Sequence, residues 1–327
     1  MVSINLSIGR TVRAAWWPAG ATWAADFATG RYMVAGSPVT ADAAFTRLRA
    51  SAKLAPDSTG RLTSFASNLP ALTDLGLLLE PAATNLCTWS SELTDSSWVK
   101  NSCALTTGQP DPTGASGATL IEEQSSGALL RRQSNLTVTS GETYTVSIFV
   151  RRFNTDWCRL SVGDSTGLGN AAWTWFNLQT GAKGSSGSGG TGFGYQSHRC
   201  EILGNYLRIS VTVLAPSATM NVGLVTASGD GQTSRANVGG GPGLGGGVIV
   251  WSAQFEVGAT ATSAIVTGST TAIRAADILQ LATASGQSVT VTFADGISQV
   301  VSAPTGPFTV PMPLNRSQVR SIVAQPA

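Results

Sequence analysis

The sequence predicts an all-β protein whose largest part is a jelly-roll β-sandwich. Apolar and polar residues alternate with a period of two in many short runs, as in 143–152, where Tyr144, Val146, Ile148 and Val150 share one face. Turn-forming Gly, Asp, Ser or Asn residues bound these runs, and helical periodicity is almost absent. Many short strands at regular spacing are typical of a sandwich or jelly roll.

We expect three segments along the chain. Residues 1–75 mix short apolar pairs with turn residues and are interpreted as an irregular N-terminal arm for attachment and oligomerisation, with one short helix at about 40–48. Residues 76–274 carry the strand-like runs of the jelly roll, with surface loops at the glycine-rich stretches 181–194 and 238–247. Residues 275–327 are expected to form a small separate β-module, with a hairpin at Asp295-Gly296 and a helical or extended tail.

The composition excludes several classes of protein. Hydrophobic residues make up 42% of the chain, which argues against disorder. The net charge is only +2 and no basic run occurs, so we expect no nucleic-acid partner. There is no 18-residue apolar run and no signal-peptide pattern, so we expect no membrane insertion. Charged residues amount to 12%, and such a surface suits a protein covered by copies of itself or by an assembly.

Residues for catalysis or for zinc binding are scarce. The four cysteines form no CxxC pair and are expected to be buried free thiols, with a Cys87–Cys103 bridge as the alternative if strands pair there. The single histidine, His198, lies in a predicted strand with only Glu201 as an acidic neighbour, and no G-x-S-x-G, HExxH or Walker A motif is present. We therefore expect a protein without enzymatic activity.

Tryptophan is the most informative residue type, with nine in the chain. Trp173 and Trp175 share one strand face, so both are expected in the core or both outside it. Trp157 lies in a polar turn and is expected to be exposed, whereas Trp98 and Trp251 are expected in the core. Amphipathic aromatic rings suit stacking on the apolar faces of sugars. Candidate carbohydrate-binding residues are Trp157, Arg159, Trp173, Trp175, Asn177 and Tyr206.

Several blocks of the sequence resemble structural proteins of tailed bacteriophages and gene-transfer agents. They are Phe45-Thr46-Arg47, residues 76–86 (GLLLEPAATNL), residues 91–100 (SELTDSSWVK), residues 175–184 (WFNLQTGAKG), Tyr206-Leu207-Arg208 and residues 248–267 (VIVWSAQFEVGATATSAIVT). Residues 291–322 resemble the small β-module that often ends such proteins, and the resemblance extends in order over roughly residues 26–327. The family includes tail fibres, minor tail proteins, head fibres and spikes, and its central domain resembles the concanavalin-like jelly roll of carbohydrate-binding modules. Asn177 stands where the family usually has Asp, which puts any site or turn needing that charge in doubt.

The resemblance implies a fibre, spike or minor tail protein on the virion surface, assembled in the bacterial host cytoplasm. Its expected partners are further copies of itself, as a homotrimer, other virion proteins and a host surface polysaccharide bound for adsorption. One alternative is a decoration or connector protein without a ligand, in which every tryptophan would be buried. A second alternative is a capsule depolymerase, which would need carboxylates clustered near the aromatic face.

Glu80 lies in an unusual junction, residues 77–89 (LLLEPAATNLCTW). Its position after three leucines and before Pro81 favours a buried carboxylate that anchors the first strand by hydrogen bonds or a metal, with an exposed acid as the plainer alternative. Similar modules hold structural Ca²⁺, so Glu80 and Glu256 are the candidate ligands for that ion. No other cofactor is expected.

Overall fold

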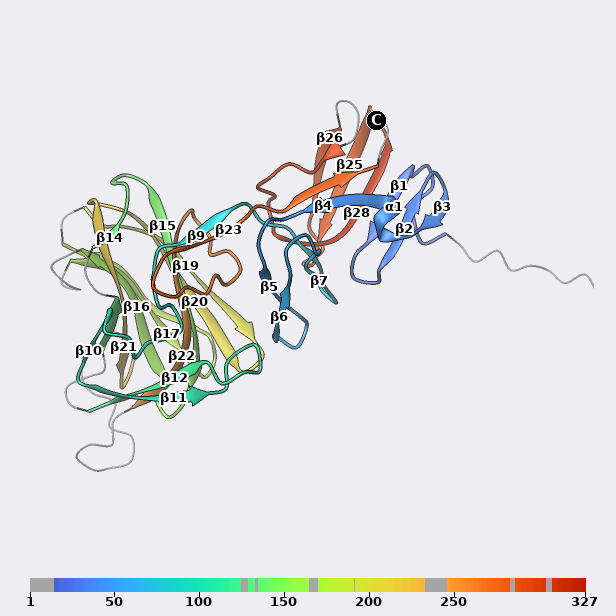
Figure 1. Ribbon diagram of the computed structural model, residues 1–327. Coiled ribbons are helices and arrows are strands. Elements are labelled where there is room, and N and C mark those ends of the chain that lie inside the picture. Colours follow the sequence, from blue (N-terminus) through green and yellow to red (C-terminus); the bar gives the residue numbers. More distant parts are fainter. Residues whose placement is uncertain are drawn as a thin grey trace, which may run out of the picture.

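The computed structural model describes residues 15–124, 129–132, 135–164, 170–190, 192–232, 246–282, 286–303 and 308–327. It confirms the all-β class, since the described residues form strands and one four-residue helix, α1 (Ala41–Ala44). The chain builds two β-bodies (Figure 1). It passes between them at residues 80–85 and 272–277, which we call the neck. No helix in the described ranges is long and apolar enough to cross a bilayer.

The larger body is a sandwich of two antiparallel sheets. The first, called the β17 sheet, has the order β10 (Trp98–Asn101), β13 (Leu129–Arg132), β21 (Thr219–Ala227), β16 (Trp157–Asp164), β17 (Ala171–Asn177) and β18 (Lys183–Gly189), with β14 (Leu136–Thr137) beside β21. The second, called the β15 sheet, has the order β11 (Cys103–Gln109), β12 (Ala118–Glu123), β22 (Gly247–Val257), β15 (Thr143–Arg152), β20 (Tyr206–Leu214) and β19 (Gly194–Leu203).

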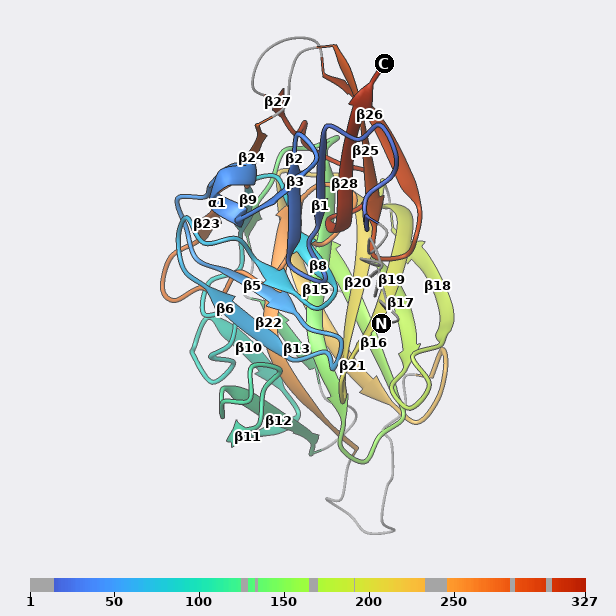
Figure 2. The same ribbon diagram turned by 90° about the vertical axis from the view of Figure 1, so that its right-hand side faces the viewer.

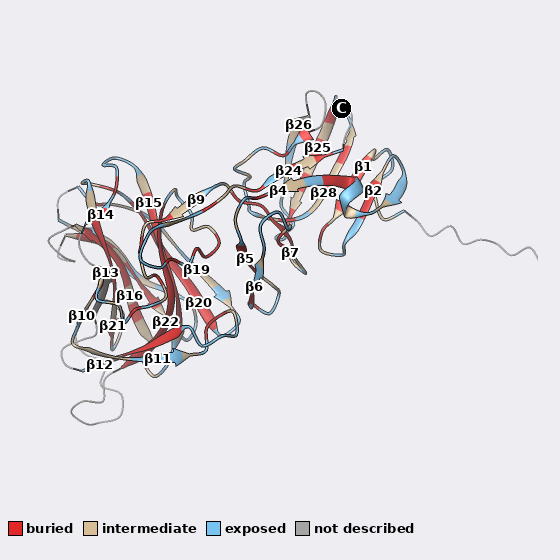
Figure 3. Ribbon diagram, in the orientation of Figure 1, coloured by how far each residue is buried: buried red, intermediate tan, exposed pale blue. Residues whose placement is uncertain are grey.

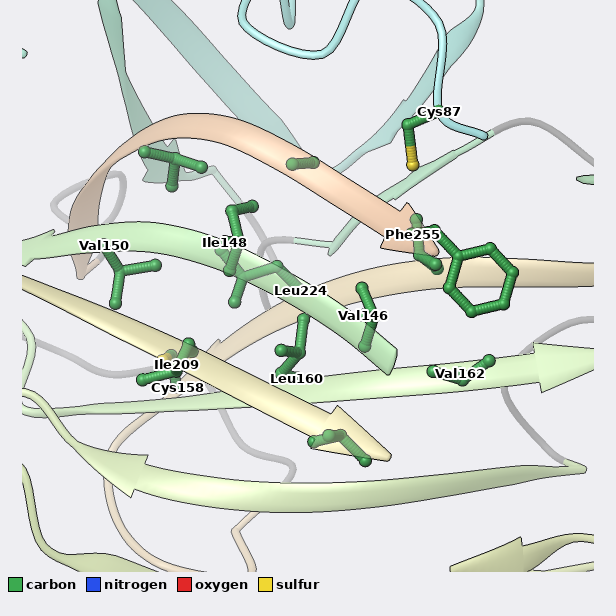
Figure 4. Close-up of a cluster of buried hydrophobic side chains, with 14 of the residues drawn as sticks. Cys87, Val146, Ile148, Val150, Cys158, Leu160, Val162, Ile209, Leu224 and Phe255 are labelled. Carbon is green, nitrogen blue, oxygen red and sulfur yellow. The ribbon is translucent and has the colours of Figure 1, made fainter. Parts of the chain in front are cut away.

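The apolar residues of the two sheets meet in one core. Val146 and Ile148 on β15 pack in the same cluster as Leu160 and Val162 on β16 (Figure 4). Alternate residues of each strand enter this core, as the period-two pattern predicted. Buried positions accordingly run along the strands of the sandwich, while exposed ones gather at turns and edges (Figure 3).

The smaller body combines the two ends of the chain. One sheet has the order β26 (Ser298–Ala303), β25 (Gln287–Phe293), β28 (Gln318–Pro326), β1 (Trp23–Asp26), β2 (Arg31–Val34) and β3 (Ser37–Val39). Strand β8 (Gly76–Leu78) pairs with β28, and β7 (Leu72–Thr73) pairs with β8. A second sheet has the order β27 (Phe308–Thr309), β24 (Ile278–Leu281) and β4 (Phe45–Leu48). Their shared core contains Trp23, Phe45, Leu279, Val291 and Ile322.

The structure differs here from the expected division into an arm, 1–75, and a separate module, 275–327. Strand β1 pairs with β28 in register, with Trp23 opposite Ala324. Leu77 and Leu78, which were expected in the jelly roll, also pair with β28. Neither end of the chain has enough apolar residues for a core of its own, and strand pairing between the two ends builds one shared core.

Some local predictions need correction as well. The expected helix at 40–48 ends at Ala44, because Phe45 starts β4 and buries its ring against Phe27 and Tyr32.

The glycine-rich stretch 181–194 contains strand β18 rather than only a loop, whereas most of 238–247 lies outside the described residues. The Asp295-Gly296 hairpin is confirmed by the pairing of β25 with β26, and the tail is the extended strand β28. The cysteines are thiols and the alternative Cys87–Cys103 bridge does not form; Cys87 and Cys158 are buried as expected, whereas Cys103 and Cys200 are only half-buried.

The neck is held by a buried network of charges. Glu80 N donates to Asp277 Oδ2 at 2.9 Å, and Asp277 N donates to Glu80 O at 3.0 Å. The Nζ of Lys53 lies 3.0 Å from Glu80 Oε2 and also pairs with Asp277. Arg49 Nη1 lies 3.1 Å from Asp277 Oδ1, and Arg274 Nη1 lies 3.7 Å from Glu80 Oε2. We call these five buried side chains the neck network. The short pair β9 (Ala83–Asn85) and β23 (Ala272–Arg274) continues from it towards the sandwich.

A hairpin from the smaller body covers the outer face of the β15 sheet. It consists of β5 (Lys53–Pro56) and β6 (Leu62–Phe65), and Leu62 packs in a cluster with Phe149, Tyr206 and Trp251. Figure 2 shows the hairpin in front of β22 and β15. At its tip Gly60 meets the backbone of the turn at Gly204, where a Cβ on Gly60 would overlap Leu203 and Gly204.

We expect Gly60→Ala to loosen this docking, because the added methyl has no space against the backbone of Gly204. Overpacking of this kind costs about 1–3 kcal/mol. Faster proteolysis at residues 57–61 and a lower unfolding midpoint would show it. Gly36→Ala is the matched control, since Gly36 has a similar positive φ (77° against 80°) but nothing within 4 Å of its Cβ position. Equal behaviour of the two variants would contradict the prediction.

Candidate functional site

The outer face of the β17 sheet gathers four of the predicted sugar-binding side chains. Trp157 and Arg159 alternate along β16, and Trp173 and Trp175 alternate along β17. Arg159 is opposite Trp175 in the register. Residues of the opposite parity on these strands, such as Cys158 and Phe176, lie in the sandwich core, so these four side chains point to the opposite face. We call Trp157, Arg159, Trp173 and Trp175 the tryptophan face.

The edge strand β18 gives two of these indoles a flat support. Gly187 is opposite Trp173, and a Cβ at Gly187 would lie 3.5 Å from Cζ2 of that indole. A Cβ at Gly184 would overlap the ring of Trp157. Glycine at both positions therefore lets each indole lie over the neighbouring strand. Trp157 and Trp173 are half-buried, which leaves part of each ring accessible.

Trp175 lies on the same face, where it supports Arg159 rather than offering its own surface to a ligand. Its side chain is only 2% exposed, so it offers a ligand almost no surface. The guanidinium carbon of Arg159 lies 5.6 Å from the ring centroid of Trp175 and 5.9 Å from that of Trp173. Arg159 is thus held between two indoles by cation–π contacts. Burial lowers the pKa of Arg159 below the usual arginine value.

One end of the tryptophan face is framed by the turn after β21. Asp230 accepts hydrogen bonds from Ser185 N at 2.8 and 3.0 Å and from Ser185 Oγ at 2.8 Å, which fixes this turn on β18. The Cβ position of Gly184 lies against both Asp230 and Trp157. The turn therefore lies next to the indole of Trp157.

The two other predicted sugar-binding residues have different places. Asn177 Oδ1 accepts hydrogen bonds from the N–H groups of Gln179 and Thr180, both at 3.0 Å, so this side chain closes the turn after β17. An amide oxygen makes these bonds without the charge of an aspartate. Tyr206 lies on the outer face of the other sheet, 1% exposed, and its hydroxyl donates to Pro110 O at 2.6 Å. Burial raises the pKa of Tyr206 to about 12.

Sequence reasoning did not predict Gly184, Gly187 and Asp230 as parts of this face. The segment KGSSGSG (183–189) alternates glycine and serine in part, but its low β-propensity favoured a loop. Asp230 follows a different strand, 45 residues from its partner Ser185. A small residue at the position next to each tryptophan is the sequence feature that could have predicted the flat surface under the indoles.

Glu80 and Glu256 do not form a Ca²⁺ site. The ammonium of Lys53 lies 3.0 Å from Glu80 Oε2, where a metal ion would have to lie, and Ser263 N donates to Glu80 Oε1 at 2.7 Å. Glu256 accepts hydrogen bonds from Thr262 N (2.9 Å), Thr262 Oγ1 (2.7 Å) and Gln254 Nε2 (2.6 Å). The described ranges contain no group of three or more His, Cys, Asp or Glu residues suited to a metal.

The two glutamates differ in their electrostatics. Burial raises the pKa of Glu80, but the charges of Lys53 and Arg274 and the bond from Ser263 outweigh it, so the net pKa is lowered. Burial also raises the pKa of Glu256, and there the hydrogen bonds from Thr262 and the charge of Arg208 offset only part of the rise. Glu256 holds residue 262 and Glu80 holds residue 263, so the expected burial and hydrogen bonding of Glu80 are confirmed. Its role as an anchor of the first strand stays a prediction.

His198 does not belong to a catalytic triad in the described structure. Its Nδ1 lies 2.7 Å from the hydroxyl of Tyr195, and its ring is stacked on that residue. Burial, together with the charge of Lys183, lowers the pKa of His198. The side chain therefore forms an aromatic pair at the edge of the β15 sheet.

Comparison with known proteins gives no family assignment, since no family model and no curated protein match the chain. Three solved structures illustrate the matches. The enzymatically active domain of bacteriophage CBA120 tailspike protein 4 has 12% identity and a TM-score of 0.32, over 53% of this chain and 21% of that one. The CBM22-1–GH10 modules of Clostridium thermocellum endo-1,4-β-D-xylanase 10B, complexed with xylohexaose, have 13% identity and a TM-score of 0.30, over 57% and 30% of the chains. TmCBM61 in complex with β-1,4-galactotriose has 8% identity and a TM-score of 0.28, over 49% and 88%.

These matches correct one expectation. The prediction of a protein without enzymatic activity does not stand, because an enzymatically active tailspike domain and modules of a xylanase are among the matched structures. The chain spans about a fifth of the tailspike domain and under a third of the xylanase modules. Several other matches are carbohydrate-binding modules with 8 to 12% identity.

Proposed function

We propose that the tryptophan face binds a polysaccharide. The observation that carries this proposal is the pair of half-buried indoles, Trp157 and Trp173, that lie over glycines of β18. One side of each ring is supported by the sheet, and the accessible part suits stacking on the apolar C–H face of a sugar. The alternative of a connector without a ligand required every tryptophan to be buried, and these two are not.

We further propose that the protein acts on the surface of a phage-type particle, where it attaches to host glycan during adsorption. The sequence resemblance to phage structural proteins and the low share of charged residues, 12%, support this setting. The smaller body would contact neighbouring copies, as a homotrimer, and other particle proteins. Several copies would raise the effective concentration of weak single sites, so modest affinity is sufficient.

An array of bacterial lipopolysaccharides and capsular polysaccharides tests the binding proposal. The purified full chain should bind a subset of the array, and reducing ends released during incubation should be measured in the same wells. Binding without release supports recognition alone, and release identifies a polysaccharide that the protein also cleaves. No binding to any member would contradict the proposal. Electron microscopy of an intact particle with an antibody against this chain tests the surface location separately.

A further inference from the structure

We propose that the polysaccharide recognised by the tryptophan face is acidic, and that Arg159 pairs with the carboxylate of a uronic acid residue. This inference rests on the proposed function and specifies its ligand class. It starts from the charge of Arg159, which the described part of the protein leaves without an acidic partner.

The three fully buried arginines of the described ranges have partners. Arg49 pairs with Asp277, Arg274 lies near Glu80, and Arg208 donates to Ser147 Oγ and to a backbone carbonyl. Arg159 differs from these three, because it has only its two indoles and makes no hydrogen bond to a described residue. The half-buried Arg151 is comparable, with its guanidinium carbon 5.4 Å from the ring centroid of Tyr206. Partly desolvated cations are rarely left without an anion, since the uncompensated charge is costly.

A second observation on the same face points the same way. Arg159 Nε is buried and has no hydrogen-bond partner within the described ranges. The hydroxyl of Ser161, two residues further along β16 and fully buried, likewise has no partner there. Ser161 is opposite Trp173 in the register, so both unsatisfied groups lie beside the same indole. Hydrogen-bonding capacity is therefore unmet at one place on this face.

The acidic side chains beside this face are already engaged. Asp230 accepts its hydrogen bonds from Ser185, and Asp156 pairs with Arg152. Neither neutralises Arg159, so the charge remains for a ligand. Because Nε is enclosed, an incoming carboxylate would meet the terminal nitrogens of the half-buried side chain.

The geometry suits a sugar that carries its carboxylate at the ring edge. The guanidinium carbon lies 5.9 Å from the centroid of Trp173, so a pyranose stacked on the accessible part of that indole would lie beside it. The carboxylate of a uronic acid extends from the edge of its ring and would reach the guanidinium. A charge-assisted bond between the two is stronger than a bond to a neutral hydroxyl. A neutral sugar would occupy the indole but leave the arginine uncompensated.

Matched pairs of polysaccharides test the inference on the full chain. The probes are polygalacturonate, alginate and hyaluronan, together with the carboxyl-reduced form of each, in which every uronic acid becomes a neutral sugar. The wild-type protein should bind at least one acidic probe about tenfold or more tightly than its reduced form, the factor expected for a charge-assisted bond. This binding should weaken as NaCl is raised.

Variants identify the residue responsible. Arg159→Gln should remove the preference for the acidic form, and Arg159→Lys should keep part of it, because it keeps the charge but not the planar fork. Arg199→Gln is the matched control, since Arg199 is an exposed strand arginine paired with Glu201 on the other sheet. It should bind as the wild type does. Thermal unfolding of each variant checks the fold.

The outcomes separate this inference from the proposed function. Equal or better binding of the reduced forms, or an unchanged preference in folded Arg159→Gln, would overturn the acidic inference and leave polysaccharide binding in place. No binding to these probes or to any member of the glycan array would overturn both. If Arg159→Gln does not fold, the comparison of acidic and reduced probes with the wild type still decides.

Discussion

Replacing Glu80 by alanine is expected to lower the free energy of unfolding by about 3–5 kcal/mol, the usual result of removing one partner of a buried ion pair. The substitution leaves the three buried cations of the neck network, Arg49, Lys53 and Arg274, with Asp277 as its remaining anion. It also removes the acceptor of Ser263 N. Urea unfolding at neutral pH measures the change.

Glu256→Gln is the matched control for this prediction. Glu256 is also buried and binds the adjacent residue Thr262, but no ion pair holds it and its pKa is raised. An uncharged amide of the same shape should therefore cost less than Glu80→Ala, about 1–2 kcal/mol for one unfavourable hydrogen bond. Similar losses in the two variants would contradict the role given to the neck network.

The pH dependence of the same proteins provides a second readout. The folded-state pKa of Glu80 is depressed, so its contribution to stability is present above the unfolded value of 4.5 and is lost as the pH falls through the folded value. The difference between wild type and Glu80→Ala should be constant near neutral pH and shrink below about 4.5. The ionisation of Glu256 changes the stability in the opposite direction, because its folded-state pKa is raised. Its ionisation destabilises the fold above that pKa, and this penalty disappears on acidification.

The double variant Trp157→Ala/Trp173→Ala is expected to lose nearly all polysaccharide binding. Removing a central aromatic anchor costs about 2 kcal/mol or more, so two together should weaken binding about a thousandfold. The fold should persist, because neither ring is in the sandwich core. Calorimetry with the array polysaccharide that binds most tightly measures the loss.

Trp17→Ala is the control for this double variant, since Trp17 is a half-buried tryptophan of the smaller body that contacts Trp16. It should retain wild-type affinity in solution. A correctly folded double variant with unchanged affinity would place the binding site elsewhere and contradict the account of the tryptophan face.

Local pattern predicted the sandwich and much of its candidate site. The alternation at Tyr144 to Val150 is confirmed in the core, and the shared face of Trp173 and Trp175 follows from strand periodicity alone. Periodicity also separates Trp157 from the buried Cys158. Such features depend on neighbours in sequence, and so a single sequence contains them.

Features that depend on distant pairing were not predictable in this way. Trp23 and Ala324 are opposite each other although the whole chain separates them, and nothing local marks them as partners. The burial of Glu80 could be predicted from its junction, but its partner Lys53 comes from a hairpin that docks from elsewhere. Tyr206 is a candidate sugar-binding residue from its sequence, yet that same hairpin covers it.

The most direct test of the tryptophan face is an NMR titration of the indole N–H signals with the tightest-binding polysaccharide. We expect the signals of Trp157 and Trp173 to shift or broaden, while those of the buried Trp23, Trp98 and Trp251 stay unchanged. Assignment by single substitutions makes each signal specific. Saturable binding that leaves Trp157 and Trp173 unchanged, or that shifts the signal of Trp251 under the hairpin instead, would contradict this expectation.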